Sequence, residues 1–296
     1  MTQEVLKKRI KTTNDLYGIV TTMKLLSSVS VGQYEKALVS LNQYTQTISL
    51  AFQGLFRQEF FSLPNTSNHQ KSGKTLVIVI GSDNGLVGRF NWELVQEVKK
   101  ESPLASMKLI TIGKRLSTSF FSKGLKPDFS YSNSNTLSEI SSLADTILTK
   151  VNQLISADNF EKVLLFYNKK ENNSFQAQKL QLLPFSEEIL KQLKETPWSG
   201  RMLPLINPEN ETLFSALSQE YLIVFLVQAL TSSLACEHYI RMLHMQQAEK
   251  NIEKKLAQLD LIYQQERQNQ ITNELIDIVS GAQAMNSSLD KSFKKQ

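Results

Sequence analysis

The residues best suited to chemistry lie in a glycine-rich turn that follows a predicted strand. Residues 75–80, Thr-Leu-Val-Ile-Val-Ile, form a largely β-branched run that is typical of a strand buried on both faces. Gly-Ser-Asp-Asn-Gly-Leu-Val-Gly follows at 81–88, and a helix is predicted from residue 91. A glycine-rich turn that leads into a helix can present backbone N–H groups to a phosphate. The other interpretation is a tight turn whose glycines supply positive φ angles.

The spacing of the three glycines favours the structural interpretation. Gly81, Gly85 and Gly88 match neither the dinucleotide pattern G-x-G-x-x-G nor the phosphate-binding loop that ends in Lys-Ser or Lys-Thr. A nucleotide-binding enzyme or switch that uses this turn therefore remains only an alternative function.

Other reactive side chains do not form a recognisable catalytic or metal-binding pattern. His69 falls in a polar linker, and His238 and His244 are six residues apart, so they do not share a helix face as i, i+4 ligands would. The single cysteine, Cys236, lies in a predicted helix and reads as a small packing residue. The sequence therefore predicts no catalytic residue, no cofactor-binding residue and no metal ligand.

Composition narrows the possible partners. The chain has 296 residues and a formal net charge of +5, which alone is too weak to indicate nucleic-acid binding. A single cysteine excludes an internal disulfide. The apolar run at 221–230 is too short to span a bilayer, and the N-terminus shows no apolar signal segment, so we expect no direct membrane insertion.

The C-terminal third of the chain predicts one very long helix. Pro208 is the last proline and Gly281 the only glycine after it, so residues 209–290 lack strong helix breakers. At 1.5 Å per residue such a helix would be about 120 Å long. A polar segment at 264–270 separates two apolar stripes with helical spacing. The stripes are Met245, Ala248, Ile252, Leu256, Leu259 and Tyr263, and then Ile271, Leu275, Ile278, Ala282, Met285 and Leu289.

The N-terminus predicts a partner for this helix. Residues 1–63 precede the first proline, and a stripe with steps of three and four runs along them, although Gly32, which follows Val29 and Val31, suggests a bend or break. The stripe is Tyr34, Ala37, Leu41, Tyr44, Ile48, Ala51 and Leu55. We expect residues 1–62 and 209–290 to form one antiparallel coiled coil.

Between the two helices the pattern changes to alternating strands and helices. Strands are predicted at 75–80, 108–112, 162–167 and 175–183, with helices at 91–100, 116–122 and 137–155. This alternation is typical of a parallel α/β sheet. The predicted fold is therefore a long antiparallel coiled coil of the terminal helices with a small Rossmann-like α/β domain, residues 74–200, inserted between them.

Three stretches of the chain resemble a known family, the gamma subunits of F-type ATP synthases. Residues 233–251 resemble the family pattern S-L-x-S-E-x-x-x-R-M-x-A-M-x-x-A-x-x-N, and 267–284 resemble its C-terminal signature. Residues 82–91 are similar to its S-D-x-G-L-C-G-x-x-N turn, with Val87 in place of cysteine and Arg89 in place of a small residue. Met23-Lys24 also agrees, whereas the basic run that follows in the family is absent here, which makes the chain a divergent member, as of an alternative ATPase operon.

The resemblance implies a central-stalk rotor that carries no catalytic site. Its partners would be the alpha and beta subunits, the epsilon subunit and the membrane c-ring, and it would couple ion flow to ATP synthesis or hydrolysis. It would be a peripheral membrane protein on the cytoplasmic face of a bacterial inner membrane. Because polar side chains on an apolar rod need partners, we expect Arg267, Gln268, Thr272 and Glu274 at the polar break to bond outside the helix pair, and the resemblance places them against loops of the beta subunits. The resemblance adds Met23 and Lys24 as partner contacts. A free-standing coiled-coil scaffold is a further alternative.

Overall fold

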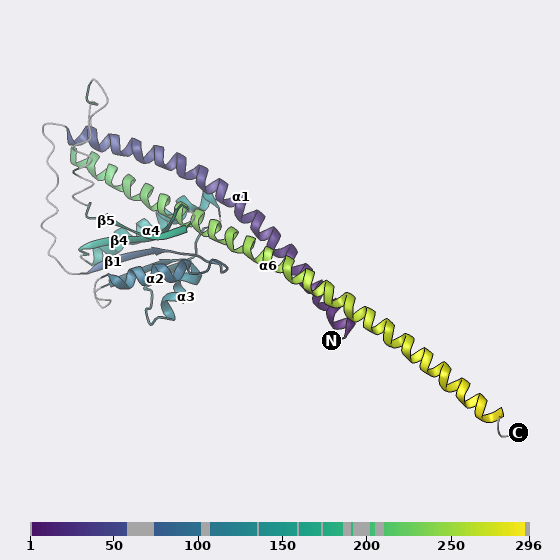
Figure 1. Ribbon diagram of the computed structural model, residues 1–296. Helices are drawn as coiled ribbons and strands as arrows, with labels where there is room; N and C mark the ends of the chain where they lie inside the picture. The colour runs from purple at the N-terminus through teal and green to yellow at the C-terminus, as the bar shows by residue number, and fades with distance from the viewer. Residues whose placement is uncertain are drawn as a thin grey trace. The chain divides into compact units, whose positions relative to one another are not determined.

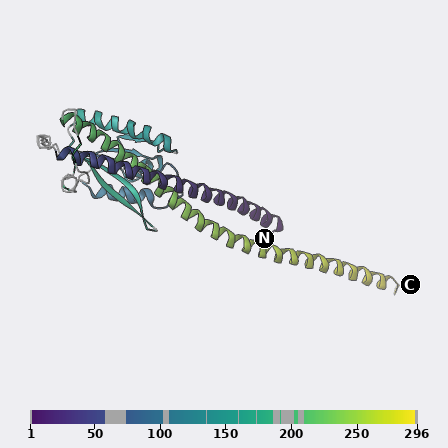
Figure 2. The ribbon, with the colours of Figure 1, turned by 90° about the horizontal axis from the view of Figure 1, so that it is seen from above.

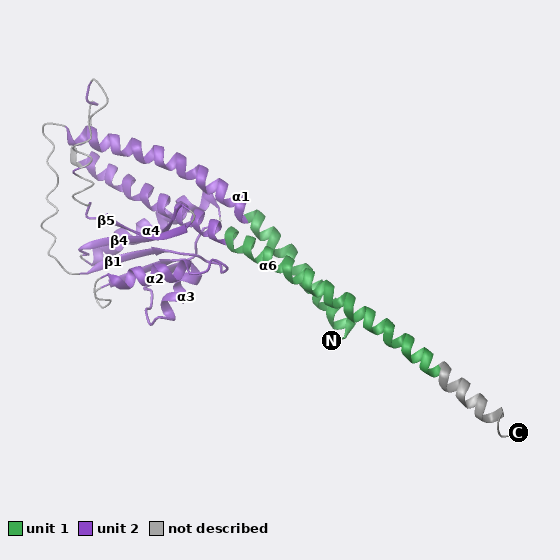
Figure 3. Ribbon diagram, viewed as in Figure 1, with its two compact units in different colours: residues 1–26, 242–296 green, residues 27–241 purple. Residues whose placement is uncertain are grey.

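The computed structural model describes residues 2–57, 74–101, 107–134, 136–158, 160–172, 174–185, 191, 202–204 and 210–293, and in the last of these ranges side chains from 212 to 281. The expected linker at 63–73 with His69 and the expected domain limits at 62, 200 and 209 lie outside these residues. Contacts divide the chain into unit 1, residues 1–26 and 242–296, and unit 2, residues 27–241 (Figure 3). Each unit is described by itself below.

Unit 2 contains a five-stranded mixed sheet in the order β3-β2-β1-β4-β5. Its strands are β1 (Thr75–Ile80), β2 (Met107–Ile112), β3 (Phe129–Tyr131), β4 (Lys162–Glu171) and β5 (Ser174–Leu183). The strands β1 to β4 pair in parallel, as predicted, but β5 pairs antiparallel to β4. The expectation of a purely parallel sheet was wrong there because only a short turn, with Asn172 at a φ of 51°, joins β4 to β5, and parallel neighbours need a longer crossover.

Helices cover both faces of the sheet (Figure 1). Side chains alternate along β1, so Ile78 and Ile80 face α4 (Leu137–Ala157) and the part of α6 (Asn210–Phe293) in unit 2. Val77 and Val79 face α2 (Phe90–Lys100) and α3 (Lys114–Phe121) on the other side. The β-branched run predicted to be buried on both faces is therefore the centre of this domain.

The long helix α1 (Gln3–Phe56) is unbroken, so the break expected at Gly32 is absent. A Cβ added at Gly32 would meet no heavy atom within 4 Å, so its missing side chain serves no packing need. In unit 2 the predicted N-terminal stripe is confirmed at Tyr34, Ile48 and Leu55, which are buried, but not at Tyr44 and Ala51. Phe52 is 2% exposed, whereas the predicted member Ala51 is exposed and Tyr44 is 46% exposed. Spacing alone permitted either choice, and the large aromatic ring gains more from burial.

Within unit 2, α1 and α6 lie side by side and run antiparallel (Figures 1 and 2). The Tyr44 hydroxyl donates to Glu220 at 2.7 Å, and Gln228 donates to Asn42 at 2.6 Å, so higher numbers on α1 face lower numbers on α6. At one end an aromatic cluster of Phe52, Phe56, Phe185, Phe214, Tyr221 and Phe225 fills the space between the elements.

Within unit 1, the remaining parts of the two helices also contact each other. The first predicted stripe of α6 is the inward face, since Met245 and Leu259 are buried and the stripe residues between them are half-buried. The second stripe is different: Ile271, Leu275 and Ile278 are 48%, 58% and 68% exposed. Because α6 has 84 residues against 54 in α1, its C-terminal part continues past the start of α1 (Figure 2).

By length and composition alone, α6 includes a window apolar enough to cross a membrane, which the sequence inspection had not recognised. Leu222, Leu226 and Leu230 in its apolar part belong to the same core as the sheet. A third of this window is buried in the protein, and packing against β1 and α4 accounts for the apolar character of that part.

The tight approach of two strand ends makes Gly113 a sensitive position. Gly113 has a φ of 121°, and an added Cβ would lie 2.8 Å from the Ser82 carbonyl oxygen. We expect Gly113→Ala to lower the free energy of unfolding by about 3 kcal/mol, from backbone strain and overpacking together. The matched change Gly18→Ala, in α1 with open space around it, should instead stabilise by about 0.5–1 kcal/mol. Urea unfolding curves check both, and equal effects of the two changes would contradict the assignment.

Candidate functional site

The glycine-rich turn closes on itself through side-chain hydrogen bonds. The Ser82 N–H donates to the Asn91 Oδ1 at 3.0 Å, and the Asn91 amide donates back to the Ser82 hydroxyl at 2.8 Å. A Cβ at Gly81 would lie only 2.6 Å from the same Oδ1, so this pair of bonds requires glycine there. The prediction that glycines supply positive φ angles in this turn is confirmed at Gly88, with a φ of 58°, but the other positive φ, 66°, belongs to Leu86.

An acidic side chain of the turn, Asp83, is bound by backbone amides at the carboxyl-terminal edge of the sheet. The Asp83 carboxylate accepts hydrogen bonds from the Lys114 N–H at 2.8 Å, the Asn133 N–H at 3.0 Å and the Ser132 hydroxyl at 2.5 Å. These amides lie at the start of α3 and after β3, at the edge of the sheet where nucleotide phosphates bind in related topologies. A phosphate would meet a carboxylate there, so the geometry opposes the nucleotide-binding alternative.

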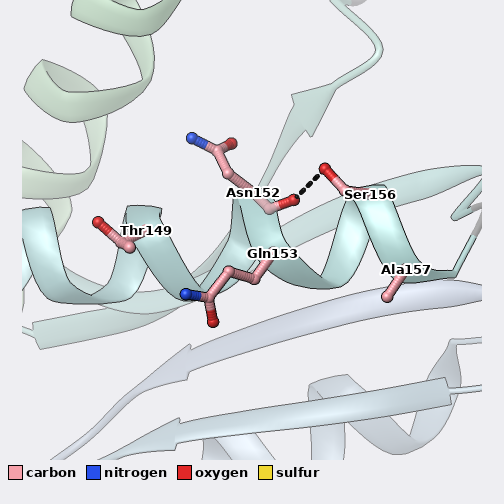
Figure 4. Close-up of a pocket in the computed structure, with 5 residues that line it drawn as sticks. All are labelled: Thr149, Asn152, Gln153, Ser156 and Ala157. Carbon is pink, nitrogen blue, oxygen red and sulfur yellow. Dashed lines mark hydrogen bonds between the residues drawn. The ribbon is translucent and has the colours of Figure 1, made fainter.

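Two hollows in unit 2 show no arrangement for catalysis. One, of about 360 Å³, lies beside the turn and is lined by residues that include Leu86, Trp92 and Arg115. The other, of about 620 Å³, lies along one face of α4 (Figure 4). It is lined by Thr149, Asn152, Gln153, Ser156 and Ala157, and the Ser156 hydroxyl donates to the backbone carbonyl of Asn152. No titratable side chain lines this second hollow, and no cluster of potential metal ligands occurs among the described residues.

A buried ion pair ties the turn to α6. The guanidinium of Arg241 lies 2.5 Å from a carboxylate oxygen of Glu237 and 3.5 Å from the carbonyl oxygen of Gly85. The side chains of Arg241 and Glu237 are only 8% and 5% exposed. Burial raises the pKa of Glu237 to about 7, although the charge of Arg241 opposes that shift.

The neighbouring residues on α6 are also buried. Burial raises the pKa of Cys236 to about 12, so its thiol is inert, as expected for a packing residue. His238 stacks on the ring of Tyr34, and burial lowers the pKa of the imidazole to about 4. The roles of Glu237 and Arg241 were missed by sequence reasoning, since i, i+4 charges usually mark a solvated helix face.

Met23 and Lys24, two of the predicted contact residues, lie on α1 within unit 1. The Lys24 ammonium lies 2.5 Å from the Glu249 carboxylate on α6 and keeps a third of its side-chain surface exposed. Met23 is half-buried beside a shallow hollow that also includes Gly18 and Ile19. Lys24 therefore has an internal partner that the sequence did not reveal.

The four predicted contact residues on α6 are exposed. The Thr272 hydroxyl donates to the backbone carbonyl of Gln268 at 2.9 Å, and the Gln270 amide donates to Glu274 at 3.3 Å. Arg267 lies 18 positions after Glu249, or about 27 Å along a helix. The structure thus separates Lys24 from Arg267 along the helix axis in unit 1, and it does not bring the six residues together in one site.

These features define a class of protein in which two long terminal helices flank an inserted α/β domain. Comparisons identify the family within this class. The family model described as ATP synthase matches residues 2–285. The chain is 26% identical over 290 residues to the ATP synthase gamma chain of Christiangramia forsetii, covering 95% of this chain and 98% of the relative. It is 28% identical over 296 residues to that of a Wolbachia of Drosophila simulans, again covering 95% and 98%.

Solved structures show the same fold. The rotor of the Euglena gracilis mitochondrial ATP synthase matches with a TM-score of 0.63 at 17% identity, covering 91% of this chain and 99% of that one. The central stalk and c-ring structure from Tetrahymena thermophila matches with a TM-score of 0.53 at 21% identity, covering 78% and 99%. The chain therefore belongs to the ATP synthase gamma-chain family. It is a non-catalytic subunit of the central-stalk rotor, as the resemblance implied.

Proposed function

We propose that this subunit turns as an axle inside a ring of alpha and beta subunits and couples ion flow through a membrane c-ring to ATP synthesis or hydrolysis. The observation that supports this proposal most strongly is the exposed apolar stripe on the last part of α6, where Ile271, Leu275 and Ile278 are all about half exposed or more. A contiguous apolar stripe in water usually marks a surface that a partner covers. A stiff helix with an apolar surface is what a rotating tip inside a ring requires.

Each part of the chain has its own role in the proposed rotor. The helical segments at 1–62 and 209–290 form the axle, and the domain at 74–200 forms the foot beside an epsilon subunit and the c-ring. The chain would then be peripheral to the membrane, on the cytoplasmic face in a bacterium, without inserting into the bilayer or binding nucleic acid. Solved complexes of matching chains, described as F1 with c-ring and as central stalk with c-ring, support the contacts with the alpha and beta subunits and the c-ring.

Co-expression with the alpha and beta subunits tests the assembly. We expect the chain to co-purify with both and to form a complex that hydrolyses ATP. A free-standing scaffold has no reason to co-purify with them. Titration of the isolated chain with ATP or NAD tests the other alternative, and binding in the micromolar range would contradict a purely mechanical role.

The proposed contacts on α6 lead to a specific prediction. Arg267 and Gln268 are exposed, so they are free to meet loops of the beta subunits, and arginine forms strong bidentate pairs with carboxylates. Thr272 and Glu274 would add hydrogen bonds to the same loops, and we call the contact made by these four residues the catch. Met23 and the exposed part of Lys24 would form a separate contact. We expect Arg267→Ala/Gln268→Ala to weaken assembly or uncouple hydrolysis from ion transport, with a loss of about 2 kcal/mol, roughly thirty-fold, at the contact.

A matched control separates this contact from general effects on the helix. Lys254→Ala/Lys255→Ala also removes two exposed polar side chains from α6, outside the proposed catch. Both double variants should keep the parental far-ultraviolet helix signal, because alanine is a strong helix former. Parental assembly and coupling in the Arg267/Gln268 variant would refute the catch but not the rotor function.

A further inference from the structure

The glycine-rich turn contains a pair of residues, Asn84 and Gly85, that can react with each other. Asn84 is the only asparagine of the chain that precedes a glycine. Because glycine has no Cβ, its backbone nitrogen is unhindered and can attack the carboxamide of the asparagine before it. The attack closes a five-membered imide ring, which is the first step in the conversion of asparagine to aspartate.

The fold does not require a glycine at position 85. Gly88 and Gly113 have φ angles of 58° and 121°, a region that side chains rarely adopt. Gly85 has no such φ angle, and an added Cβ would meet nothing nearer than the end of the flexible Arg115 side chain, at 3.3 Å. An alanine at this position is therefore compatible with the turn, which makes the chemistry of the pair testable.

The two reacting groups are accessible. Asn84 is exposed, and Gly85 lines the hollow of about 360 Å³ beside the turn, so water reaches the pair. Neither the Asn84 carboxamide nor the Gly85 N–H forms a hydrogen bond with any residue that the structure describes. Neither group therefore has to give up a hydrogen bond in order to react.

Two guanidinium groups lie beside Gly85. Arg241 contacts its carbonyl oxygen at 3.5 Å, and Arg115 approaches from the side where a Cβ would stand. The reaction develops negative charge, first on the deprotonated nitrogen and then on the oxygen of the tetrahedral intermediate. Positive groups close to that charge stabilise the transition state.

We propose that Asn84 is a modification site, at which the turn converts spontaneously to aspartate and isoaspartate. The Gly85 nitrogen gives its proton to a base in solution and bonds to the Asn84 Cγ. The Cγ–Nδ2 bond breaks, and the amide nitrogen takes up a proton and leaves as ammonia. Water then opens the imide ring: attack at Cγ gives aspartate, and attack at the backbone carbonyl carbon gives isoaspartate, whose main chain passes through the side-chain carbons.

Isoaspartate changes the contact between the turn and α6. Its main chain is one carbon longer between residues 84 and 85, so the carbonyl oxygen of Gly85 moves. Arg241 contacts that oxygen at 3.5 Å, near the limit of a hydrogen bond, and the buried ion pair with Glu237 holds the guanidinium in place. Isoaspartate therefore breaks this contact, whereas aspartate adds a charge and keeps the length of the main chain.

Mass spectrometry of the full chain tests the site. The folded protein is kept at about pH 8 and sampled over several days, and trypsin releases residues 75–89 as one peptide. A sample digested at once corrects for conversion during digestion. We expect aspartate and isoaspartate at Asn84, while the exposed Asn152, which precedes a glutamine, remains an amide. Conversion at Asn84 that is no faster than at Asn152 would overturn the proposal.

Three variants test the route of the reaction. Gly85→Ala hinders the attacking nitrogen and should slow conversion by about ten-fold or more. Arg115→Ala should slow it by about three-fold, because solvent and salt partly screen an exposed guanidinium. The control Lys123→Ala removes an exposed cation after α3 and should leave the rate unchanged. An unchanged rate in Gly85→Ala would overturn the imide route, and one in Arg115→Ala would overturn the contribution of its charge.

Unfolding in urea tests the structural consequence. Cation exchange separates the converted chains, which contain both products, from the parent. Their unfolding midpoint is compared with that of Asn84→Asp, which has the same charge and a normal main chain. We expect a lower midpoint for the converted chains, and equal midpoints would overturn the loss of the Arg241 contact.

Discussion

Arg241→Ala is expected to lower the free energy of unfolding by about 3–5 kcal/mol, because it leaves a buried carboxylate without its counter-ion. Arg241 is the group that balances Glu237, and both side chains are nearly fully buried. The same guanidinium also contacts the carbonyl oxygen of Gly85, so the change removes the link between α6 and the glycine-rich turn. Chemical denaturation of the full chain at pH 8 measures the loss.

The destabilisation by Arg241→Ala should depend on pH. The folded-state pKa of Glu237 is raised from 4.5 to about 7, so this group contributes stability that is present below pH 4.5 and is lost as pH rises through 7. A neutral carboxyl needs no counter-ion, so the difference between parent and variant should be larger at pH 8 than at pH 5. His238 acts in the opposite direction: its lowered pKa contributes stability above pH 6.5 that is lost as pH falls through 4.

Two control variants identify the cause of the destabilisation by Arg241→Ala. Glu237→Gln should abolish the loss of stability between pH 4.5 and 7, since the titrating carboxyl is gone, so that only the opposite dependence from His238 remains there. Arg267→Ala removes an exposed guanidinium and should change stability by no more than about 0.5 kcal/mol. An Arg241→Ala effect as small as that of Arg267→Ala would show that the pair is not buried in solution.

Phe52→Ala is the second change with a large expected effect, a loss of about 3–5 kcal/mol. Phe52 is 2% exposed, and its ring centroid lies 5.7 to 6.2 Å from those of Phe56, Phe185, Phe214 and Tyr221. Removing the ring would leave a cavity among four other aromatic rings, which are too rigid to fill it. Denaturant unfolding at constant m-value measures the effect.

The control for Phe52 is Val39→Ala, also on α1 in unit 2 but 60% exposed. Because alanine has the higher helix propensity and little apolar burial is lost, this change should be neutral or slightly stabilising. Similar effects of the two changes would contradict the burial of Phe52.

The general fold could be predicted because its signals are local. Proline-free ends predict long helices, and a β-branched run such as 75–80 predicts a central strand whichever face is considered. The direction of β5 was missed because it depends on the length of one turn, and β3 was missed because three residues carry almost no periodicity. The choice between Ala51 and Phe52 also escaped the pattern, since steps of three and four allow either.

The site was harder to predict than the fold because its partners come from distant parts of the sequence. Glu237 and Arg241 look like an ordinary helical charge pair until the turn at Gly85 covers them. The Lys24–Glu249 contact joins residues 225 positions apart, which no spacing rule reaches. The exposed residues on α6, by contrast, were predicted from a polar interruption in an apolar stripe, and their partner contact remains a prediction.

Observation of rotation in single complexes tests the proposed mechanical function most directly. The chain would be assembled with its alpha and beta subunits, the ring fixed to a surface, and a bead attached through Lys123→Cys, an exposed position after α3. Cys236 can stay, because it is fully buried and its thiol is inert. We predict that ATP drives continuous rotation of the bead in one direction. ATP hydrolysis by an assembled complex whose bead does not rotate would contradict the account.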